Sequence, residues 1–330
     1  MAGETVCVTG ASGLTASWLV KLLLERRYTV RGTFRSPVPG ANDHLKLVPA
    51  DLLEQGSFDQ AVEGCDGVFH TASLFFTKNI TDPQAQLIDP AVKGTLNVLA
   101  SCVKAHTRKV VVTSSVAAVA YTPELKSTSV VDESWWSDSD YCQETSWICQ
   151  TSMIYDAGLL AWYFVSKTLA ERAAWDFVKE KNLDMVFINP SMVLGPVLQG
   201  SKNTSNDIIL DFLNGEHFLN LQHMFRNSCI GCVGVKNVAM AHILAYESAT
   251  STGCYICAEQ LLHYTDLVAL LSKLYPTYPI CAKDAEETEA RVPVFTLSAQ
   301  KVKDLGLNFQ PIEEVIHETV TSFKEWGWLA

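Results

Sequence analysis

The chain has 330 residues, 48% of them hydrophobic, which is enough to bury the core of one large α/β domain or of two lobes. Its net charge of −11 and its pI of about 5.2 argue against nucleic-acid binding and against attachment to an anionic membrane surface. No apolar run has the length of a transmembrane helix, and residues 1–8 carry no signal-peptide pattern, so we expect a cytoplasmic protein.

The first predicted elements are a short apolar strand at 5–9 and a helix at 17–26, joined by a glycine-rich turn. This order forms the context of a dinucleotide-binding fingerprint. Gly10 allows the tight turn, Gly13 lets a pyrophosphate approach the backbone, and the helix N-terminus supplies N–H donors and a positive dipole end. We predict that the turn binds the phosphates of a dinucleotide, and a plain βα turn is the alternative. The predicted contacts are Gly10, Ser12, Gly13, Leu14 and Thr15.

The second strand, at 28–34, ends in Arg35. In NAD-binding proteins an acidic residue at this strand end usually takes the ribose 2′-hydroxyl, whereas an arginine favours a 2′-phosphate. Arg35 therefore predicts NADP as the cofactor, with Arg31 as a possible second ligand. The alternative is that both arginines are solvated surface residues.

Three further strands are predicted at 45–48, 67–70 and 109–112, with a helix at 84–104 before the last of them. Small or polar residues follow each strand, at the sheet edge where ligands of doubly wound folds bind. The hydroxyl of Ser115, just past the third of these strands, can hydrogen-bond a substrate carbonyl, and capping of a turn is the alternative. The first two strand ends are expected to contact the cofactor through Asp51, Leu52, Thr71, Ala72 and Ser73.

Tyr163 and Lys167 are four residues apart, and the run that follows them, 168–179, predicts a helix, so both side chains share one helix face. An ammonium beside a phenol favours the phenolate form. A tyrosine of this kind can give a proton to a carbonyl oxygen while hydride reaches the carbonyl carbon. The same spacing also occurs by chance on ordinary helices. It indicates a catalytic pair here only together with the polar residues at the predicted strand ends.

A sixth strand at 183–188 closes in Asn189-Pro190, beside the expected nicotinamide position. Beyond residue 196 the alternation of strands and helices loosens. The predicted fold is α/β, a doubly wound and mostly parallel Rossmann sheet with a smaller α/β C-terminal substrate lobe. We assign residues 1–190 and about 230–248 to the NADP-binding domain, and about 191–229 and 249–330 to the substrate-binding lobe.

The ten cysteines are expected to be reduced in a cytoplasmic protein. Cys229-x-x-Cys232 and Cys254-x-x-Cys257 resemble zinc knuckles, but both lie in apolar, strand-like runs. Residues three apart on a strand point to opposite faces, which prevents joint chelation. We therefore predict buried structural thiols and no metal site.

The motifs Gly10-x-x-Gly13-x-x-Ala16, Tyr163-x-x-x-Lys167 and Asn189-Pro190, together with Ser115, resemble the extended short-chain dehydrogenase/reductase superfamily. The strings Cys65-Asp-Gly-Val-Phe-His-Thr-Ala-Ser73 and Ser166-Lys-Thr-Leu-Ala-Glu171 are similar to the plant group that holds dihydroflavonol reductases, cinnamoyl-CoA reductases and phenylacetaldehyde-type reductases.

This resemblance implies an NADPH-dependent carbonyl reductase of phenylpropanoid metabolism, a monomer or homodimer that takes a small aromatic substrate. It makes Ser115, Tyr163 and Lys167 the catalytic triad and Arg35 the 2′-phosphate ligand. Pro190 and Val193 join the expected cofactor contacts. By position in the chain, Val116, Tyr121 and Met192 are expected to line the substrate pocket.

The substrate prediction rests on two stretches that disagree. Residues 257–259 and 272–280 look like cinnamoyl-CoA reductase, which favours reduction of a hydroxycinnamoyl-CoA thioester to the aldehyde. Ala161-Trp-Tyr-Phe-Val-Ser-Lys167 is closer to aldehyde-reducing members, since cinnamoyl-CoA reductases typically read Asn-Trp-Tyr-Cys-Tyr-Gly-Lys there. An aryl-aldehyde reductase, a dihydroflavonol reductase-like ketone reductase and a non-catalytic NADPH-binding protein are the alternatives.

Two departures from the group's pattern concern the site. The segment between Arg35 and Asp51 is about ten residues shorter than usual and lacks the lysine that often shares the 2′-phosphate. An additional stretch at 143–160 precedes Tyr163 and is expected to form a lid or wall, or to disturb the site.

Overall fold

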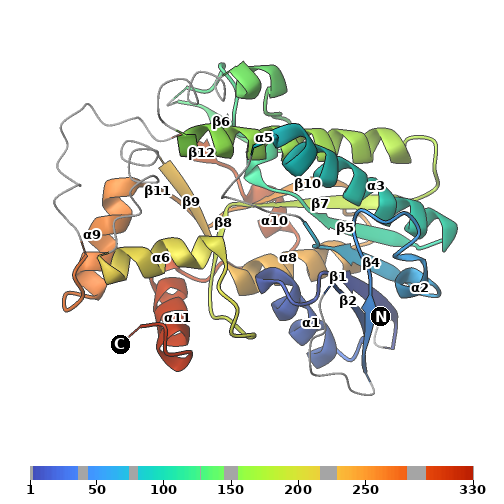
Figure 1. Cartoon of the computed structure of the whole chain (residues 1–330), viewed down its shortest axis with the longest axis horizontal. Helices are drawn as coiled ribbons and strands as arrows, with labels where there is room; N and C mark the ends of the chain where they lie inside the picture. Colours follow the sequence, from blue (N-terminus) through green and yellow to red (C-terminus); the bar gives the residue numbers. More distant parts are fainter. Residues whose placement is uncertain are drawn as a thin grey trace.

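A seven-stranded sheet with the order β10-β7-β5-β4-β1-β2-β3 lies at the centre of the molecule, and all neighbouring pairs are parallel (Figure 1). The computed structural model describes residues 3–35, 44–73, 81–126, 128–144, 155–215, 229–280 and 295–329, with the backbone alone at 155–160. The predicted doubly wound α/β fold is confirmed. The strands are β1 (Thr5–Thr9), β2 (Thr29–Phe34), β3 (Leu45–Pro49), β4 (Gly67–His70), β5 (Lys109–Thr113), β7 (Asp184–Pro190) and β10 (Gly253–Cys257).

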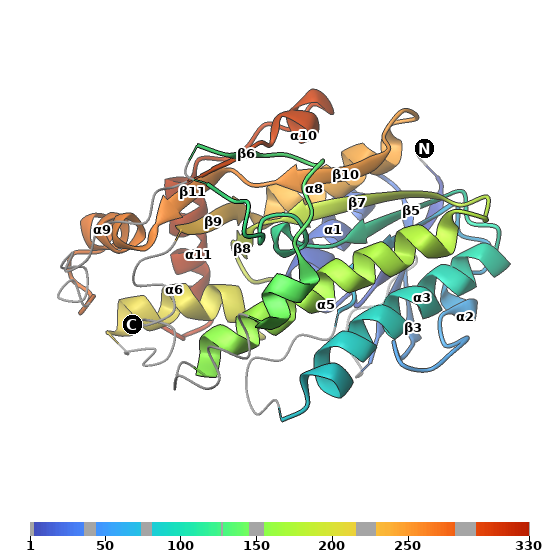
Figure 2. The ribbon, with the colours of Figure 1, turned by 90° about the horizontal axis from the view of Figure 1, so that it is seen from above.

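Helices cover both faces of this sheet (Figure 2). Because side chains alternate along a strand, Val6 and Val8 of β1 belong to the core cluster on one face and Cys7 to the cluster on the other. All three side chains are fully buried, as expected for parallel strands covered on both faces. One face carries α1 (Leu14–Glu25), α8 (Val235–Glu247) and α10 (Gln300–Asp304), and the other carries α2 (Asp59–Val62), α3 (Asp89–Lys104) and α5 (Tyr155–Val178).

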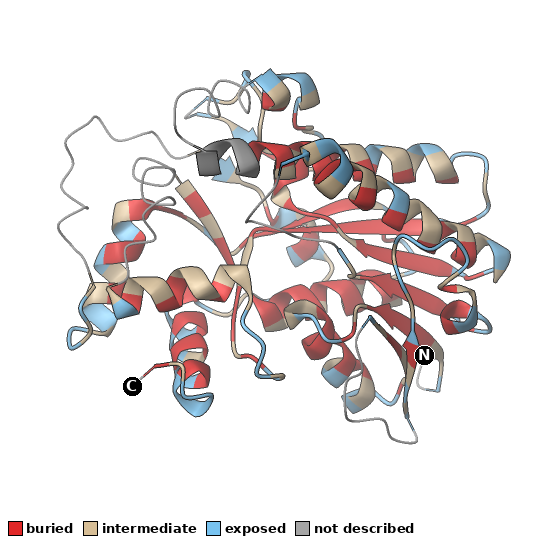
Figure 3. Ribbon diagram, viewed as in Figure 1, coloured by how far each residue is buried: buried red, intermediate tan, exposed pale blue. Residues whose placement is uncertain are grey.

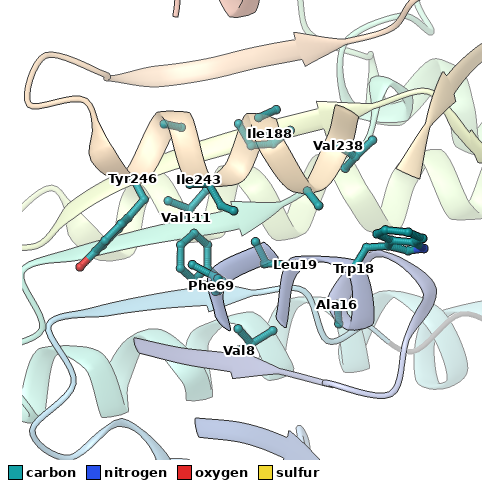
Figure 4. Packing of buried hydrophobic residues seen from close by; sticks show 14 of the residues in the cluster. Val8, Ala16, Trp18, Leu19, Phe69, Val111, Ile188, Val238, Ile243 and Tyr246 are labelled. Atoms are coloured by element: carbon teal, nitrogen blue, oxygen red, sulfur yellow. The ribbon is translucent and has the colours of Figure 1, made fainter. Parts of the chain in front are cut away.

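Among the described residues, the hydrophobic cluster on the α1 face of the main sheet is larger than the cluster on the opposite face. Figure 4 shows part of the larger cluster. Leu19 of α1, Phe69 of β4 and Val111 of β5 meet there, and Tyr246 of α8 closes the cluster at the amino ends of the strands. Figure 3 shows that the strands are buried along most of their length. This core holds the strand ends rigidly and so positions the loops that follow them.

A smaller lobe follows β7, because the chain runs from Pro190 directly into β8 (Met192–Leu194). β8 pairs with β9 (Cys229–Gly234), which pairs with β11 (Gln260–His263), in a separate three-stranded sheet. The carboxyl ends of the parallel strands therefore face this lobe (Figure 1). Its helices are α6 (Thr204–Asn214), α9 (Tyr264–Leu274) and α11 (Ile312–Glu325), and β6 (Val130–Val131) pairs with β12 (Thr296–Leu297) beside it.

The placement of two apolar strands differs from the prediction. The segment 230–248, which we assigned with the main sheet, divides: α8 packs on β5 and β7, but β9 lies in the smaller sheet, while β10 adds to the main sheet beside β7. Both runs are short, apolar and rich in cysteine, so their composition does not distinguish them. The connection through α8 carries the chain back to a parallel neighbour of β7. The boundaries between cofactor-binding and substrate-binding parts stay a prediction.

Two helices begin differently from the prediction. α1 begins at Leu14 rather than at residue 17, because Gly13 already has the extended backbone of an N-cap, with φ −71° and ψ 161°. α3 is preceded by a π-helical turn, η1 (Gln84–Ile88), so the predicted helix at 84–104 has two parts.

No disulfide joins any two of the eight cysteines within the described ranges. Cys232, Cys254 and Cys257 are buried as predicted, whereas Cys229 is half-buried. The two Cys-x-x-Cys pairs lie on β9 and β10, which belong to different sheets. In the part of the chain that the structure describes, no helix has both the length and the apolar composition of a membrane span.

Candidate active site

The turn after β1 is built around Gly10, whose φ of +66° is the left-handed conformation that favours glycine. A Cβ at this position would lie 3.1 Å from both the Cα and the Cβ of Ala72, at the end of β4. The N–H of Gly13 donates to the Gly10 carbonyl at 2.9 Å. Gly10 is therefore needed both to make the tight turn and to let two strand ends approach each other.

The hydroxyl of Thr9 joins the same two strand ends. Its oxygen accepts the N–H of Thr71 at 3.1 Å and of Ala72 at 3.0 Å, and it lies 2.9 Å from Nδ1 of His70. Because two donors occupy the oxygen, the hydroxyl proton goes to Nδ1, which assigns the ring proton of a neutral His70 to Nε2. Burial, and then the charge of Lys167, lower the pKa of His70 to about 3.

The first turn of α1 suits an anion. Ser12 and Gly13 are exposed, Leu14 and Thr15 are half-buried, and no side chain caps this end of the helix among the described residues. The first backbone N–H groups of a helix have no partner within the helix and carry its positive dipole end. This cradle fits a dinucleotide pyrophosphate as the glycine pattern predicts.

Arg31 of β2 and Arg35, which directly follows this strand, have different surroundings. Arg35 is exposed at the carboxyl end of the strand, where a 2′-phosphate would lie. Arg31 instead donates to the carbonyl groups of Gln60 and Glu63 at the end of α2. The suggestion that Arg31 assists with the phosphate is therefore wrong, because its guanidinium closes a helix terminus. Residues 36–43, which hold most of the shortened segment, lie outside the described residues.

Asp51 and Leu52 follow β3 in a local turn. The carboxylate of Asp51 accepts the N–H of Leu53 at 2.8 Å, and the side-chain amide of Asn97 donates to the Leu52 carbonyl at 2.8 Å. Leu52 also packs against Gly94 of α3. These contacts fix the loop at the sheet edge where an adenine would rest.

Ser115 precedes a short 3-10 turn, η2 (Val116–Ala118), which packs against α5. Its Oγ accepts the N–H of Ala117 at 3.1 Å, so the capping role that the sequence left open is real. A hydroxyl that accepts a hydrogen bond still has its proton to donate. Capping thus orients Ser115 without preventing it from binding a carbonyl oxygen.

Tyr163 and Lys167 lie on one face of α5, as predicted, with the Lys167 Nζ 5.7 Å from the centre of the Tyr163 ring. Both side chains are half-buried. Nζ also donates to the Ser73 hydroxyl at 3.2 Å, which joins the helix to the end of β4. A cleft lies between α3, α5 and the ends of β4 and β5, lined on its polar side by His70, Ser73, Thr113, Ser114, Lys167 and Glu171.

The predicted substrate contacts stay a prediction, and the structure shows what each of them packs against. Val116, Tyr121 and Met192 belong to three different apolar clusters, and none of them lines the cleft beside Lys167. Tyr121 packs on Phe164, with ring centres 4.8 Å apart. Val193 is half-buried on β8, and Pro190 is buried at the end of β7. Of the additional stretch at 143–160, the described backbone at 155–160 forms the start of α5, and 145–154 lie outside the described residues.

Sequence reasoning missed two buried titratable residues beside the predicted site, His70 and Glu171. Both line the cleft, and neither is exposed by more than 3%. The signal for Glu171 was present, since it stands four residues after Lys167 and so continues the face of Tyr163. The signal for His70 was its place at the end of a fully buried strand.

Three comparisons with known proteins show what this chain is similar to. The model of the NAD dependent epimerase/dehydratase family matches residues 6–224. "Cinnamoyl-CoA reductase CAD2" of Medicago truncatula is 48% identical and aligns with 98% of this chain and 96% of its own length. "Cinnamoyl-CoA reductase 1" of Petunia hybrida is 45% identical, over 100% of this chain and 95% of its own. The structure of Gre2 from Candida albicans in complex with NADPH has a TM-score of 0.81 at 28% identity, over 98% of this chain and 99% of that one.

Proposed function

Because this chain belongs to the NAD dependent epimerase/dehydratase family, among the extended short-chain dehydrogenases/reductases, we propose that it is an NADPH-dependent reductase of a hydroxycinnamoyl-CoA thioester. The observation that carries this proposal is the similarity to cinnamoyl-CoA reductases, which extends over the whole chain at 45–48% identity. The aldehyde product belongs to phenylpropanoid metabolism.

The residues present fit NADPH. The turn at Gly10 packs directly against the end of β4, and a Cβ at Gly10 would push the two apart. The backbone N–H groups at the start of α1 then form the cradle for the pyrophosphate. Arg35 stands where it can meet the 2′-phosphate, and Lys167 stands where it can hold the nicotinamide ribose. NADPH supplies the hydride when it is bound. Asp51, Leu52, Thr71, Ala72, Pro190 and Val193 complete the proposed cofactor contacts.

The chain's own groups manage the proton and the carbonyl oxygen. Ser115 donates a hydrogen bond to that oxygen, and Tyr163 gives it a proton as negative charge develops. Lys167 keeps a positive charge beside the phenol ring. With a thioester, the resulting hemithioacetal releases CoA as a thiol and leaves the aldehyde. With an aldehyde, the same steps give an alcohol.

A second candidate function is reduction of an aryl aldehyde. The specific observation in its favour is the stretch Ala161-Trp-Tyr-Phe-Val-Ser-Lys167, in which Phe164 packs on Tyr121 beside the proposed acid. Phe164 is larger than the cysteine that cinnamoyl-CoA reductases typically have after this tyrosine, so it changes the shape of the site beside Tyr163.

The test is oxidation of NADPH by the purified protein, with feruloyl-CoA in one assay and coniferaldehyde or phenylacetaldehyde in another. Thioester-dependent oxidation with release of free CoA thiol, in equal amounts, is the expected result. Activity with the aldehydes alone would replace the thioester proposal with the aldehyde one. Cofactor binding without turnover of any substrate would overturn both in favour of a non-catalytic NADPH-binding protein. NADH in place of NADPH serves as the control for the role of Arg35.

We further propose that the enzyme acts in the cytoplasm as a monomer or homodimer on a small aromatic substrate, without nucleic-acid or membrane partners. The eight described cysteines form no disulfide with one another, which suits a reducing compartment.

A further inference from the structure

Glu171 lies one helical turn beyond Lys167, on the face of α5 that also carries Tyr163. Its side chain is only 1% exposed, although it ends in a carboxyl group. A carboxyl group is seldom buried to this extent unless it is fully hydrogen-bonded. The surroundings of Glu171 therefore need an explanation beyond packing.

Two uncharged side chains donate hydrogen bonds to this carboxyl group. The Nδ2 of Asn189 lies 3.0 Å from Oε2, and the Sγ of Cys254 lies 2.9 Å from Oε1. The side chains of Ser114 and Trp175 also lower the pKa of Glu171, against the effect of its burial. The two donors come from β7 and β10, so this one carboxyl group ties two neighbouring strands of the main sheet to α5.

One of these donors reaches the predicted catalytic serine. The same Nδ2 of Asn189 donates to the backbone carbonyl of Ser115 at 3.1 Å, and the N–H of Ser114 donates to the Ile188 carbonyl at 2.8 Å. The Oδ1 of Asn189 is buried and has no hydrogen-bond partner among the described residues. The direction of this amide is thus set by Glu171 on one side and by Ser115 on the other.

We propose that Glu171 is a positioning residue that holds Asn189, and through it the backbone of Ser115, in register with the helix that carries Tyr163. Both hydroxyl groups then reach one carbonyl oxygen. This inference rests on the proposed reduction, in which Ser115 and Tyr163 share the substrate oxygen. Since its partners are uncharged donors, the role needs a hydrogen-bond acceptor and no negative charge. Burial raises the pKa of Glu171 above its usual range, which agrees with a role independent of charge.

The experiment compares Glu171→Ala with Glu171→Gln, whose amide oxygen still accepts from Asn189. For each folded variant, NADPH affinity is measured by fluorescence titration, and kcat and KM are measured with the substrate that the wild type reduces. We expect Glu171→Ala to lower kcat about 10- to 100-fold, because small misplacements of reacting groups have effects of this size. NADPH affinity and KM should stay within about twofold, and Glu171→Gln should recover kcat to within about threefold of the wild type.

The matched control is Thr168→Val, since this buried hydroxyl donates only to the Phe164 carbonyl of its own helix, at 2.8 Å. It should leave kcat unchanged. A Glu171→Ala protein that melts earlier but keeps the wild-type kcat per NADPH-binding site would overturn the proposal, as would a Glu171→Gln protein as slow as Glu171→Ala. If Glu171→Ala does not fold, Asn189→Ala removes the same link and must show the same loss of kcat.

A second measurement does not depend on the substrate. Hydrogen exchange in the NADPH complex reports the backbone at 113–118 directly. We expect faster exchange there in Glu171→Ala than in Thr168→Val, and equal exchange would overturn the positioning role. An inactive wild type would contradict the proposed function, and the exchange experiment would still decide whether Glu171 positions Ser115.

Discussion

The two ends of the parallel sheet both carry buried polar side chains, but the partners of these side chains differ. At the amino end, Tyr246 donates to the Glu4 carboxylate at 2.8 Å, Arg108 pairs with the same carboxylate at 2.9 Å, and Tyr28 donates to Glu247 at 3.0 Å. Charged and phenolic groups there bind one another. Burial raises the pKa values of Tyr28 and Tyr246, so both stay protonated.

At the carboxyl end, a hydroxyl and an amide side chain also bind backbone groups of the loops that follow the strands. Thr9 holds the N–H groups of Thr71 and Ala72, and Asn189 holds the Ser115 carbonyl. These contacts orient loops while the N-terminus of α1 and the cleft beside Lys167 stay accessible. The comparison of the two sheet ends shows that burial alone does not mark a polar residue as functional. Such a residue indicates function when its contacts position other groups and leave donors available to a ligand.

The largest effect is expected at the carboxyl end from Tyr163→Phe. Loss of the proton donor should reduce turnover at least about 100-fold, the usual size of a general-acid contribution. NADPH affinity should change by less than about twofold, because the ring remains beside Lys167. Steady-state assays and fluorescence titration check both statements. Turnover close to that of the wild type would remove Tyr163 from the role of acid.

Gly10→Ala should be next in size. The residue would adopt a φ of +66° at a cost of about 1–2 kcal/mol, and its Cβ would meet Ala72 at 3.1 Å, which separates the two strand ends. We expect NADPH affinity to fall about tenfold. Gly64→Ala is a matched control, since Gly64 has the same φ of +66° but nothing within 4 Å of its Cβ. Equal losses of NADPH affinity in the two variants would contradict the cradle assigned to Gly10.

Acid should destabilise the carboxyl end of the sheet, where the Nε2 of His242 in α8 lies 2.7 Å from the Thr113 hydroxyl at the end of β5. Burial lowers the pKa of His242 to about 4. Below pH of about 6.5 the unfolded chain binds a proton at this residue that the folded chain does not, so stability falls as pH drops towards 4. The loss is about 1.4 kcal/mol per pH unit for one histidine. His242→Gln should flatten the curve by this slope in urea unfolding. An unchanged slope in His242→Gln would show that other groups carry the acid sensitivity.

The smallest effect is expected at the amino end. Tyr246→Phe removes the hydrogen bonds of the hydroxyl to Glu4 and Arg108, which remain paired with each other at 2.9 Å, and keeps the ring packed on Gly67. Unfolding free energy should fall by about 1 kcal/mol. Both kcat and NADPH affinity should equal those of the wild type. A change in kcat or in NADPH affinity would show that the amino end of the sheet also contributes to the proposed reaction.

Local patterns alone were sufficient for part of this site. The conformation of Gly10 and the common face of Tyr163 and Lys167 depend on neighbours within a few residues, so their spacing in the sequence predicts their geometry. The buried apolar strands predict a parallel sheet covered on both faces, and the structure confirms it. The prediction also placed the polar residues at the carboxyl ends of strands.

Only the tertiary structure decided which distant groups meet. β9 and β10 have similar compositions, and their places depend on the path through α8 and on the surfaces left to cover. Arg31 binds the end of α2 rather than a phosphate because that helix terminus lies within its reach. Glu171, Asn189 and Ser115 are linked across three elements far apart in the chain. Hydrogen bonds of this kind depend on the register of packed layers, which local spacing does not specify.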